Sequence, residues 1–341
     1  MGGDRGPAEV VAAAKMALKK VPKLGELILV GDRSLLETEL KQVGLEPGER
    51  LSIHHASEVI EMRDKPLQAF KRKKDSSMVR AIELVKEGRA KGLVSCGNTG
   101  ALMAGGTIRL RMLDGVDRPA LASVIPNKKS HFILIDAGAN PEARPEHLMH
   151  NAILGSIYCR IALGVAFPRV GLLTIGTEEG KGNELTHDTH ELLKQVKSVI
   201  NYAGPIEGFQ VFDNRVDVVV CDGFVGNILL KTCEGLFHTL KDYLMEEITR
   251  NPLRKLGAFL SLGAFKTMKS QLSPERYGGA PLLGLRGNIL KAHGSSNRES
   301  IMNAIRIGVE MVEQDMNVHI VEDLAKANQL TAGAGSPEPQ A

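Results

Sequence analysis

The sequence contains no tryptophan, and aromatic residues make up only 4% of its 341 residues. Because sequence-tolerant binding of single-stranded nucleic acid depends on aromatic rings that stack on bases, nucleic acid is not an expected partner. Basic residues outnumber acidic residues by only 43 to 40, and the net charge of +3 is too small to indicate a polyanion partner. The global composition therefore leaves local patches as the only indications of binding.

Cysteine pairs and long apolar runs are also missing. The four cysteines are Cys96, Cys159, Cys221 and Cys233. They form no C-x-x-C pair and no cluster with histidine at zinc spacing, so we expect reduced thiols and no metal. No run approaches the roughly 18 apolar residues of a membrane-spanning helix, and no basic and apolar leader opens the chain. These absences predict a cytoplasmic protein.

Short apolar runs alternate with amphipathic segments along most of the chain. Seven runs are predicted strands: residues 26–30, 51–54, 92–96, 120–125, 131–135, 169–175 and 216–221. Helical patterns lie between most of them, including residues 8–20 after Pro7, and a helix that Asp32 caps and Gly44 ends. This alternation predicts an α/β fold with a mostly parallel sheet flanked by helices. Residues 1–330 are expected to form one domain, and the Gly-, Pro- and Ser-containing residues 331–341 a disordered tail.

Residues 248–274 depart from the alternation because they contain no acidic residue. Their bases are Arg250, Arg254, Lys255, Lys266 and Lys269, and their apolar series includes Phe259 and Leu260. This pattern predicts a basic amphipathic helix or helical hairpin. Packing on the core, a dimer interface and docking on a membrane surface remain alternatives at this point.

Four predicted strands end in polar, glycine-rich loops. These are residues 95–100, 136–140, 176–183 and 222–227. Ligands of open α/β sheets bind beyond the carboxyl ends of strands, and helix amino termini favour anions. Three of the loops lead into helical patterns that begin near Ala101, Glu184 and Ile228, so phosphate is the ligand that this chemistry favours. Any one loop taken alone is equally well a tight strand-to-helix turn.

The familiar nucleotide motifs are not complete. Gly176 and Gly180 are separated by three residues, and Lys181 is followed by Gly182 instead of Ser or Thr, so a nucleotide phosphate loop is not expected. No G-x-G-x-x-G follows a strand, which weakens the case for a nicotinamide-dependent dehydrogenase. Cys96 and Cys221 end strands but have no local histidine, and we expect them to be buried and inert.

Read in order, these segments resemble the bacterial phosphate acyltransferase family of phospholipid synthesis. The matching segments are residues 1–4, 29–32, 72–78, 97–101, 118–120, 171–184, 218–231, 277–280 and 292–296. The resemblance implies a Rossmann-like three-layer fold related to phosphate acetyltransferases and isocitrate- or isopropylmalate-dehydrogenase-like enzymes. It also implies a homodimer without metal or organic cofactor, loosely attached to the membrane through residues 248–274.

The implied reaction converts fatty acyl-[acyl-carrier-protein] and inorganic phosphate to acyl phosphate and free carrier protein. A membrane glycerol-3-phosphate acyltransferase would then use the product. The basic run of residues 71–74 is a solvated face or a contact for the acidic carrier. An enzyme that uses acyl-coenzyme A, a dehydrogenase on the related fold and a non-catalytic membrane scaffold are the alternatives.

The reaction requires a bound phosphate dianion and donors for a tetrahedral oxyanion. We expect Lys181 to compensate charge, Asn227 to donate to the oxyanion or phosphate, and His293 to handle a proton or orient its loop. The expected phosphate or substrate residues are Gly97, Asn98, Thr99, Gly100, Asp136, Asn140, Thr177, Gly180, Gly182, Asn183, Asp222 and Gly226. The expected membrane or carrier contacts are Arg254, Lys255, Phe259, Leu260, Lys266 and Lys269.

Family members begin with a strand that runs into Asp-Ala-Met-Gly-Gly-Asp, and residue 1 of this sequence corresponds to the Met of that motif. We therefore expect the first strand of the family's sheet to be missing here. A missing strand leaves a gap or an exposed edge in the sheet.

Overall fold

The computed structural model describes residues 1–178, 180–272 and 277–333, with the backbone alone for residues 269–272 and 333. The strands are β1 Leu27–Gly31, β2 Leu51–His55, β3 Gly92–Ser95, β4 Ala120–Pro126, β5 His131–Ile135, β6 Arg169–Thr174, β7 Asn201–Glu207, β8 Val218–Val220, β9 Ala280–Leu283 and β10 Asn288–Lys291. The helices are α1 Gly6–Lys20, α2 Arg33–Val43, α3 Pro66–Arg72, α4 Ser77–Lys86, α5 Thr99–Leu110, α6 Pro145–Leu163, α7 Glu184–Gln195, α8 Gly223–Thr249, α9 Pro252–Leu260, α10 Leu262–Leu272, α11 Arg298–Glu313 and α12 Met316–Gly333, with a 3₁₀ turn at Gln210–Phe212.

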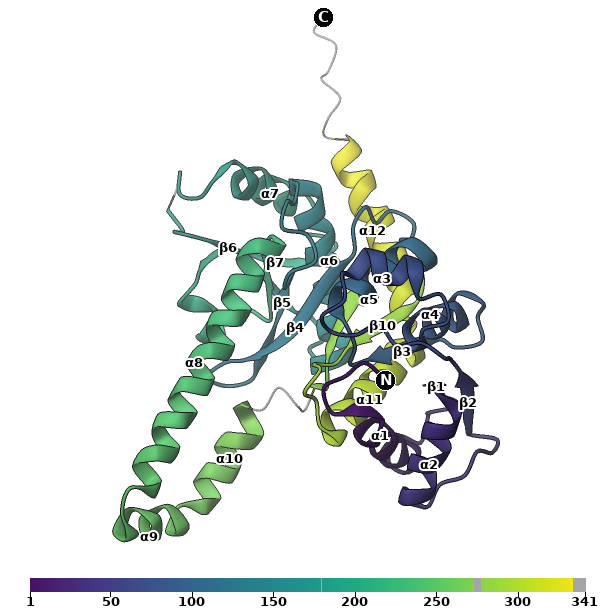
Figure 1. The fold of residues 1–341 in the computed structure, drawn as a ribbon. Helices are drawn as coiled ribbons and strands as arrows, with labels where there is room; N and C mark the ends of the chain where they lie inside the picture. Colours follow the sequence, from purple (N-terminus) through teal and green to yellow (C-terminus); the bar gives the residue numbers. More distant parts are fainter. Residues whose placement is uncertain (179, 273–276, 334–341) are drawn as a thin grey trace, which may run out of the picture.

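The strands form two sheets. β1 and β2 pair in parallel, and the other eight strands follow the order β3-β10-β9-β4-β5-β8-β6-β7. β9 is antiparallel to β10 and β4, and β4 is antiparallel to β5, while the remaining pairs are parallel. Helices cover the sheets on both sides (Figure 1). The expected three-layer α/β fold with a mostly parallel sheet is therefore confirmed.

Local signals fix several helix ends as the sequence predicts. Asp32 caps α2 by accepting a hydrogen bond from the Leu35 N–H at 2.9 Å. Gly44 ends this helix in the left-handed conformation, with φ of 66°, which glycine adopts without steric cost. Pro7 lies in the first turn of α1. These three residues explain why the first two predicted helices are confirmed.

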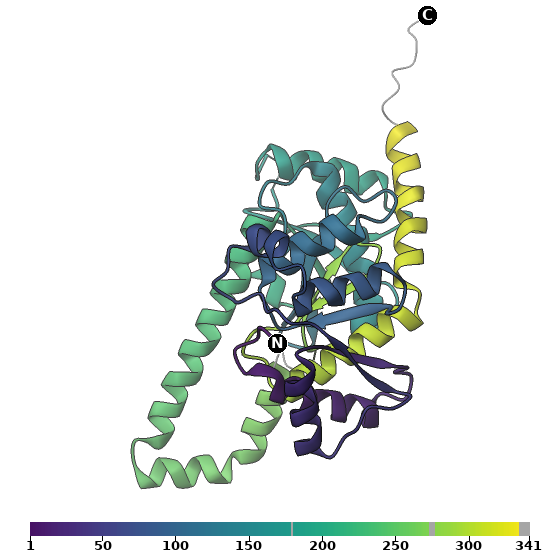
Figure 2. The same ribbon diagram turned by 45° about the vertical axis from the view of Figure 1, so that its right-hand side comes forward.

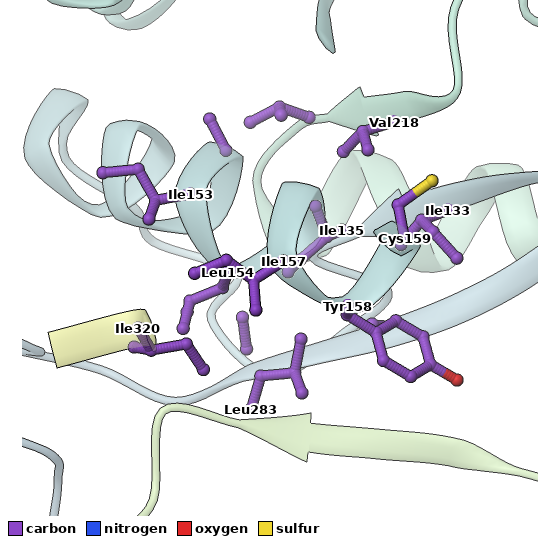
Figure 3. Packing of buried hydrophobic residues seen from close by; sticks show 14 of the residues in the cluster. Ile133, Ile135, Ile153, Leu154, Ile157, Tyr158, Cys159, Val218, Leu283 and Ile320 are labelled. Carbon is purple, nitrogen blue, oxygen red and sulfur yellow. The ribbon is translucent and has the colours of Figure 1, made fainter. Parts of the chain in front are cut away.

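The main core lies between α6 and the central strands, as Figure 3 shows. Every residue from 147 to 159 of α6 is buried, and the side chains of Leu154 and Tyr158 are completely enclosed. β5 supplies an unbroken buried run on the opposite side. Because such a strand is covered on both faces, its sequence shows no polar alternation.

All seven predicted strands are present, with ends shifted by up to two residues. The sequence prediction missed β7, β9 and β10, which contain Pro205, Pro281 and a short Asn-Ile-Leu-Lys stretch respectively. Proline removes a backbone donor and argues against a strand when only the sequence is considered. β7 lies at the sheet edge, where a missing donor is tolerated.

Helices α8, α9 and α10 form an arm that projects from the body (Figures 1 and 2). α8 has 27 residues, a length of about 40 Å at 1.5 Å per residue. Residues 248–274, expected to form a basic amphipathic helix or helical hairpin, contain the helices α9 and α10, and residues 273 and 274 lie outside the described residues. No helix in the described part of the chain has the length and apolar character needed to cross a membrane.

The carboxyl-terminal prediction needs a correction. Helix α12 continues through Gly333, so residues 331–333 belong to a helix and not to a tail. The Thr331 hydroxyl donates to the Ala327 carbonyl at 3.2 Å, a bond that ties it to the preceding turn. The rest of the predicted tail, residues 334–341, lies outside the described residues.

Candidate functional site

The loop after β5 packs directly against the first turn of α8. A Cβ atom on Gly226 would lie 1.8 Å from the backbone oxygen of Asp136, so only glycine fits there. The Gly223 N–H donates to the Asn140 carbonyl at 2.8 Å. The structure therefore joins two of the predicted loops, residues 136–140 and 222–227, through backbone contacts.

Asp136 organises the first of these loops. Its carboxylate is fully buried and accepts backbone hydrogen bonds from Leu121, Gly138, Ala139 and Asn140 at 2.7–3.1 Å. Burial raises the pKa of the Asp136 carboxyl, although these four bonds act in the opposite direction. With its oxygens engaged by the loop, Asp136 shapes the site and does not face a ligand.

Helix α8 begins earlier than the sequence pattern indicates. It starts at Gly223 instead of near Ile228, because the Asp222 carboxylate caps it by accepting from the N–H groups of Phe224 and Val225 at 2.9 Å. Asn227 therefore lies in the first turns of this helix. Its side chain is exposed and lies next to Gly138, which places an amide beside the β5 loop.

The loop after β6 leads into α7 as predicted. Asn183 caps the helix by accepting from the Thr186 N–H at 3.0 Å, and the Thr186 hydroxyl accepts from the Asn183 N–H at 2.9 Å. Gly182 has φ of 111° and lies close to the hydroxyls of Thr186 and Thr174. The Thr174 hydroxyl is buried and has no hydrogen-bond partner among the described residues.

Lys181 lies in this loop with its side chain exposed, as do Thr177 and Gly180. Among the described residues no hydrogen bond or ion pair engages the Lys181 ammonium, whereas its backbone N–H donates to the Glu178 carbonyl at 3.1 Å. The ammonium is thus placed on a glycine-containing loop beside the amino terminus of α7, where an anion would be stabilised.

A second group of loops meets around the amino terminus of the chain. The Asp4 N–H donates to the Gly294 carbonyl at 2.9 Å. Gly3 lies against Cys96, and Gly2 lies against Gly97. Residues 2–4, the loop after β3 and the loop after β10 therefore form one cluster.

Asn98 is buried and holds this second cluster together. It caps α5 by accepting from the Ala101 N–H at 3.0 Å. Its Nδ2 donates to the carbonyls of Glu61, Met62 and Asp64 at 3.1–3.2 Å. Both polar atoms of the Asn98 side chain are therefore hydrogen-bonded within the protein. At Gly97, Thr99 and Gly100, the groups that could bind a ligand are the backbone N–H groups at the start of α5.

His293 is exposed on the loop after β10. Its Nδ1 accepts from the Ser295 N–H at 3.3 Å and lies 2.8 Å from the Ser295 hydroxyl. With Nδ1 acting as an acceptor, the ring carries its proton on Nε2, which remains available. The bonds orient the ring and leave the Nε2–H to donate a hydrogen bond to a ligand, so in this arrangement His293 orients and donates and does not take up a proton.

The sequence prediction missed Lys291, which lies at the end of β10. Its ammonium donates to the Ala292 carbonyl. Burial lowers the pKa of Lys291, while the nearby Cys96 and Asp4 act to raise it. Its place one residue before residues 292–296 was the available signal, but only the fold shows that this lysine is half-buried.

The cysteines behave as expected of buried, inert thiols. Cys96 and Cys221 are both buried. Burial raises the pKa of Cys96 and raises that of Cys221 well above its ordinary value. Neither thiol is therefore poised as the thiolate that nucleophilic catalysis requires.

The four predicted loops do not share one edge of the sheet. β5, β8 and β6 are parallel neighbours, so their carboxyl ends lie together. β4 and β9 reverse the direction, so β3 and β10 run the opposite way. Ala139 nevertheless packs against the apolar cluster that contains Ala101 and Leu102 of α5, so the β5 loop borders the same cluster as that helix.

The predicted membrane or carrier contacts lie on the arm. Lys255, Phe259, Leu260 and Lys266 are exposed. Arg254 is exposed as well and forms an ion pair with Glu247 of α8. The side chain of Lys269 lies outside the described residues.

Comparison with known proteins identifies the chain's relatives. A model of the fatty acid synthesis protein family matches residues 1–319. A phosphate acyltransferase of Desulfitobacterium hafniense (strain DSM 10664 / DCB-2) is 47% identical over 328 residues, which cover 96% of each chain. A phosphate acyltransferase of Syntrophotalea carbinolica is 43% identical over 330 residues, covering 96% of this chain and 93% of that protein.

The fold is similar to that of solved acyl-transferring enzymes. A phosphotransacetylase of Streptococcus pyogenes superposes with a TM-score of 0.60 at 14% identity, covering 90% of this chain and 91% of that chain. A branched-chain phosphotransacylase of Enterococcus faecalis V583 gives a TM-score of 0.52 at 16% identity, over 91% and 97% of the two chains. Such low identities support the fold alone. The family match and the full-length relatives together show that this chain belongs to the fatty acid synthesis protein family.

Proposed function

We propose that this protein transfers a fatty acyl group from the thioester of an acyl carrier protein to inorganic phosphate, giving acyl phosphate and free carrier protein. The observation that carries the proposal is the family match over residues 1–319, together with full-length relatives named phosphate acyltransferase at identities between 42% and 47%. The acyl carrier and the fatty chain go beyond those names and are what the resemblance of the ordered segments to the phosphate acyltransferase family implies.

The chemistry needs few protein groups. A phosphate oxygen attacks the thioester carbonyl carbon, a tetrahedral oxyanion forms, and the C–S bond breaks as the carrier thiolate leaves. Because a thiolate is a good leaving group, the site has to position the phosphate dianion and stabilise the oxyanion. Backbone N–H groups and neutral or cationic donors are sufficient for both tasks, so the proposal requires neither metal nor organic cofactor.

Three helix amino termini supply those N–H groups. α5, α7 and α8 all begin directly after strand-end loops and are capped by Asn98, Asn183 and Asp222 respectively. The partial positive charge at a helix amino terminus favours an anion. α7 and α8 follow the adjacent strands β6 and β8, which favours this pair of helices as the phosphate-binding side.

Three side chains complete the proposed site. The exposed Lys181 ammonium balances the phosphate charge, and the Asn227 amide donates to phosphate or to the oxyanion. The His293 ring donates a hydrogen bond to phosphate or to the oxyanion through its Nε2–H, because its Nδ1 accepts from Ser295. Asp136 and Asn140 fix the β5 loop on which Asn227 packs.

The basic run at residues 71–74 is the proposed carrier contact. Lys71, Arg72 and Lys74 are exposed, whereas Lys73 is half-buried and pairs with Asp64 at 2.6 Å. These three exposed cationic side chains beside the α3–α5 side of the site would attract an acidic carrier protein and speed its encounter. The position also places the carrier close to Pro66, which lies against Gly100.

The arm is the proposed membrane and dimer surface. α9 exposes Leu253, Phe259 and Leu260 at 67–78% of their full area, next to Arg254 and Lys255. Exposed apolar side chains flanked by bases favour an anionic bilayer surface. α8 exposes a second apolar series between the arm tip and the body, including Leu236, Leu240 and Tyr243, which we assign to the homodimer contact.

The product suggests where the enzyme works. An acyl phosphate is reactive, so release next to a membrane glycerol-3-phosphate acyltransferase would limit its hydrolysis. The reaction would then be the first step toward phosphatidic acid in bacterial phospholipid synthesis. A cytoplasmic protein held at the membrane by the arm fits this sequence of reactions.

The deciding experiment incubates the protein with palmitoyl-acyl carrier protein, with and without phosphate, and traps the product with hydroxylamine. We expect acyl hydroxamate and free carrier thiol only when phosphate is present. Thiol release that is independent of phosphate would mean a thioesterase and overturn the proposal. Equal turnover of acetyl-coenzyme A would favour the acetyltransferase alternative, and a substrate-dependent absorbance change with a nicotinamide would favour the dehydrogenase.

A further inference from the structure

Lys291 carries a charge that the described part of the protein does not neutralise. It is the last residue of β10 and is half-buried. Its ammonium donates to the Ala292 carbonyl, and among the described residues no carboxylate forms an ion pair with it. Burial lowers its pKa, whereas Cys96 and Asp4 act in the opposite direction. Because a half-buried charge without an ionic partner costs free energy, this position is explained if a reacting group supplies the opposite charge.

The position of Lys291 connects it to the proposed carrier contact. Lys291 lies opposite Ser95 in the parallel pair of β10 and β3, and the Ala292 N–H donates to the Ser95 carbonyl at 2.9 Å. The chain after β3 enters α5, and α5 contacts both β10 and α3 (Figure 1). Helix α3 carries Lys71 and Arg72 of the basic run. A thioester on a carrier held at α3 would therefore enter the site beside the end of β10, where Lys291 lies.

The charges near Lys291 favour the thioester over inorganic phosphate as its partner. The exposed carboxylate of Asp4 lies against Gly294, in the loop after β10. At a given distance it would repel a phosphate dianion about twice as strongly as a singly charged thiolate. The helices proposed to bind phosphate, α7 and α8, follow β6 and β8, which run in the opposite direction to β10. Both features assign Lys291 to the carrier side of the reaction.

We propose that Lys291 is a further catalytic residue, whose ammonium stabilises the thiolate of the carrier as it leaves. This role rests on the proposed function, because it assigns a protein group to the departing sulfur of that reaction. Lys181 then balances the charge of the phosphate, Asn227 and His293 donate to the phosphate or to the oxyanion, and Lys291 acts on the sulfur.

The departing sulfur benefits from a cation because Lys291 lies where water is partly excluded. When the tetrahedral intermediate collapses, the C–S bond breaks and its electron pair goes to the sulfur. The ammonium of Lys291 balances this charge and keeps its own proton, and solvent protonates the thiolate after its release. Water stabilises a free thiolate, but beside a half-buried lysine a fixed cation replaces that water. Because β3 and β9 hold β10 on both sides, the cation is positioned before the reaction begins.

A change of leaving group tests this role. Phosphate-dependent thiol release by wild type and Lys291→Met is measured with palmitoyl-acyl carrier protein and with the palmitoyl thioester of 4-nitrothiophenol, whose thiolate is much less basic. With the carrier thioester, Lys291→Met should reduce kcat about 100-fold, the loss typical of one electrostatic donor, without raising the KM for phosphate. With the aromatic thioester the loss should be less than about fivefold, because that thiolate leaves without help. Such turnover also shows that the variant is folded.

Two further variants complete the test. Lys291→Arg keeps the charge and should retain most of the turnover, and Lys91→Met, at an exposed lysine directly before β3, should behave as wild type. A raised KM for phosphate at unchanged kcat would assign Lys291 to phosphate and overturn the proposal, as would equal losses with both donors or no loss at all. Absence of phosphate-dependent release by wild type would instead refute the proposed function.

Discussion

Helices α6 and α8 are both rich in apolar residues, yet they lie in opposite environments. Every residue of α6 from 147 to 159 is buried, whereas α8 buries only Gly223 and Gly226. α6 lies among β5, β8, α7 and α12, while α8 leaves the body after its first turns (Figure 2). The apolar residues of α6 therefore stabilise the fold, whereas those of α8 are exposed and available to bind a partner.

The largest effect is expected from shortening a buried side chain of α6. Leu154 of α6 is 0% exposed and Leu240 of α8 is 60% exposed. Leu154→Ala should lower the free energy of unfolding by about 2–5 kcal/mol, and Leu240→Ala by less than about 0.5 kcal/mol. Urea unfolding followed by circular dichroism, at dilute protein, measures both. Equal losses would mean that α8 is packed as α6 is, and a loss for Leu240→Ala that grows with protein concentration would support the dimer contact.

The next effect concerns the one part of α8 that belongs to the site. Asn227→Ala should reduce turnover about 100-fold, the loss typical of an oxyanion donor, with unchanged unfolding. Lys231→Ala, one turn further along the same helix, is the matched control and should retain activity. Lys181→Ala should also lose turnover through poorer phosphate binding. If Lys181→Ala and Asn227→Ala both kept near-normal turnover, the site assignment would be wrong.

A smaller difference in unfolding free energy is expected between two ion pairs, one half-buried in the body and one exposed on the arm. Arg169 donates two side-chain hydrogen bonds to Asp217 at 2.9 Å, and its backbone N–H donates a third at 2.8 Å. Asp217→Asn should cost about 1–3 kcal/mol. Removing the exposed Arg250–Glu247 pair, which is 3.1 Å long, should cost at most about 1 kcal/mol.

The Asp217 pair also gives a pH dependence. Burial acts to raise the pKa of Asp217, but the hydrogen bonds and charge of Arg169 outweigh it and hold that pKa below its usual value. A depressed folded-state pKa means that the stabilisation is complete above the ordinary value of about 4 and is lost as pH falls through the folded-state value. The difference in unfolding free energy between wild type and Asp217→Asn should therefore shrink below pH 4. A constant difference would contradict the linkage.

The smallest effect is expected at the tip of the arm. Leu260→Glu should weaken binding to anionic vesicles, measured by sedimentation, about tenfold, because it removes one apolar contact worth about 1.5 kcal/mol and places a negative charge next to a negatively charged surface. Leu330→Glu, on α12 at the other end of the molecule (Figure 2), makes the same change away from the arm and should bind normally. Unchanged binding by Leu260→Glu would assign the helix to a protein contact.

The parts of the site that the sequence predicts are those that depend on residues close together in the chain. Asp222 and Asn183 precede helical patterns, and both cap helices in the structure. The apolar pattern predicts a start of α8 near Ile228, five residues late, because the Asp222 cap begins the helix at Gly223. Asn98 was expected to contact a ligand, yet its amide binds three carbonyls of residues 61–64. Those carbonyls lie more than thirty residues away in sequence, so their position could not be inferred.

The sequence by itself determined the seven strands with strong apolar runs, the caps of the helices and the composition of the arm. These features depend on neighbouring residues, whose propensities act within one turn or one strand. Tertiary structure alone decided the antiparallel pairing of β4 and β9, the half-buried position of Lys291 and the contacts of Asn98 with the carbonyls of residues 61–64. Each of these features depends on contacts between elements that are distant in the sequence. Hydrogen bonding and exclusion from water at these positions are determined by how the elements pack together and not by neighbouring residues.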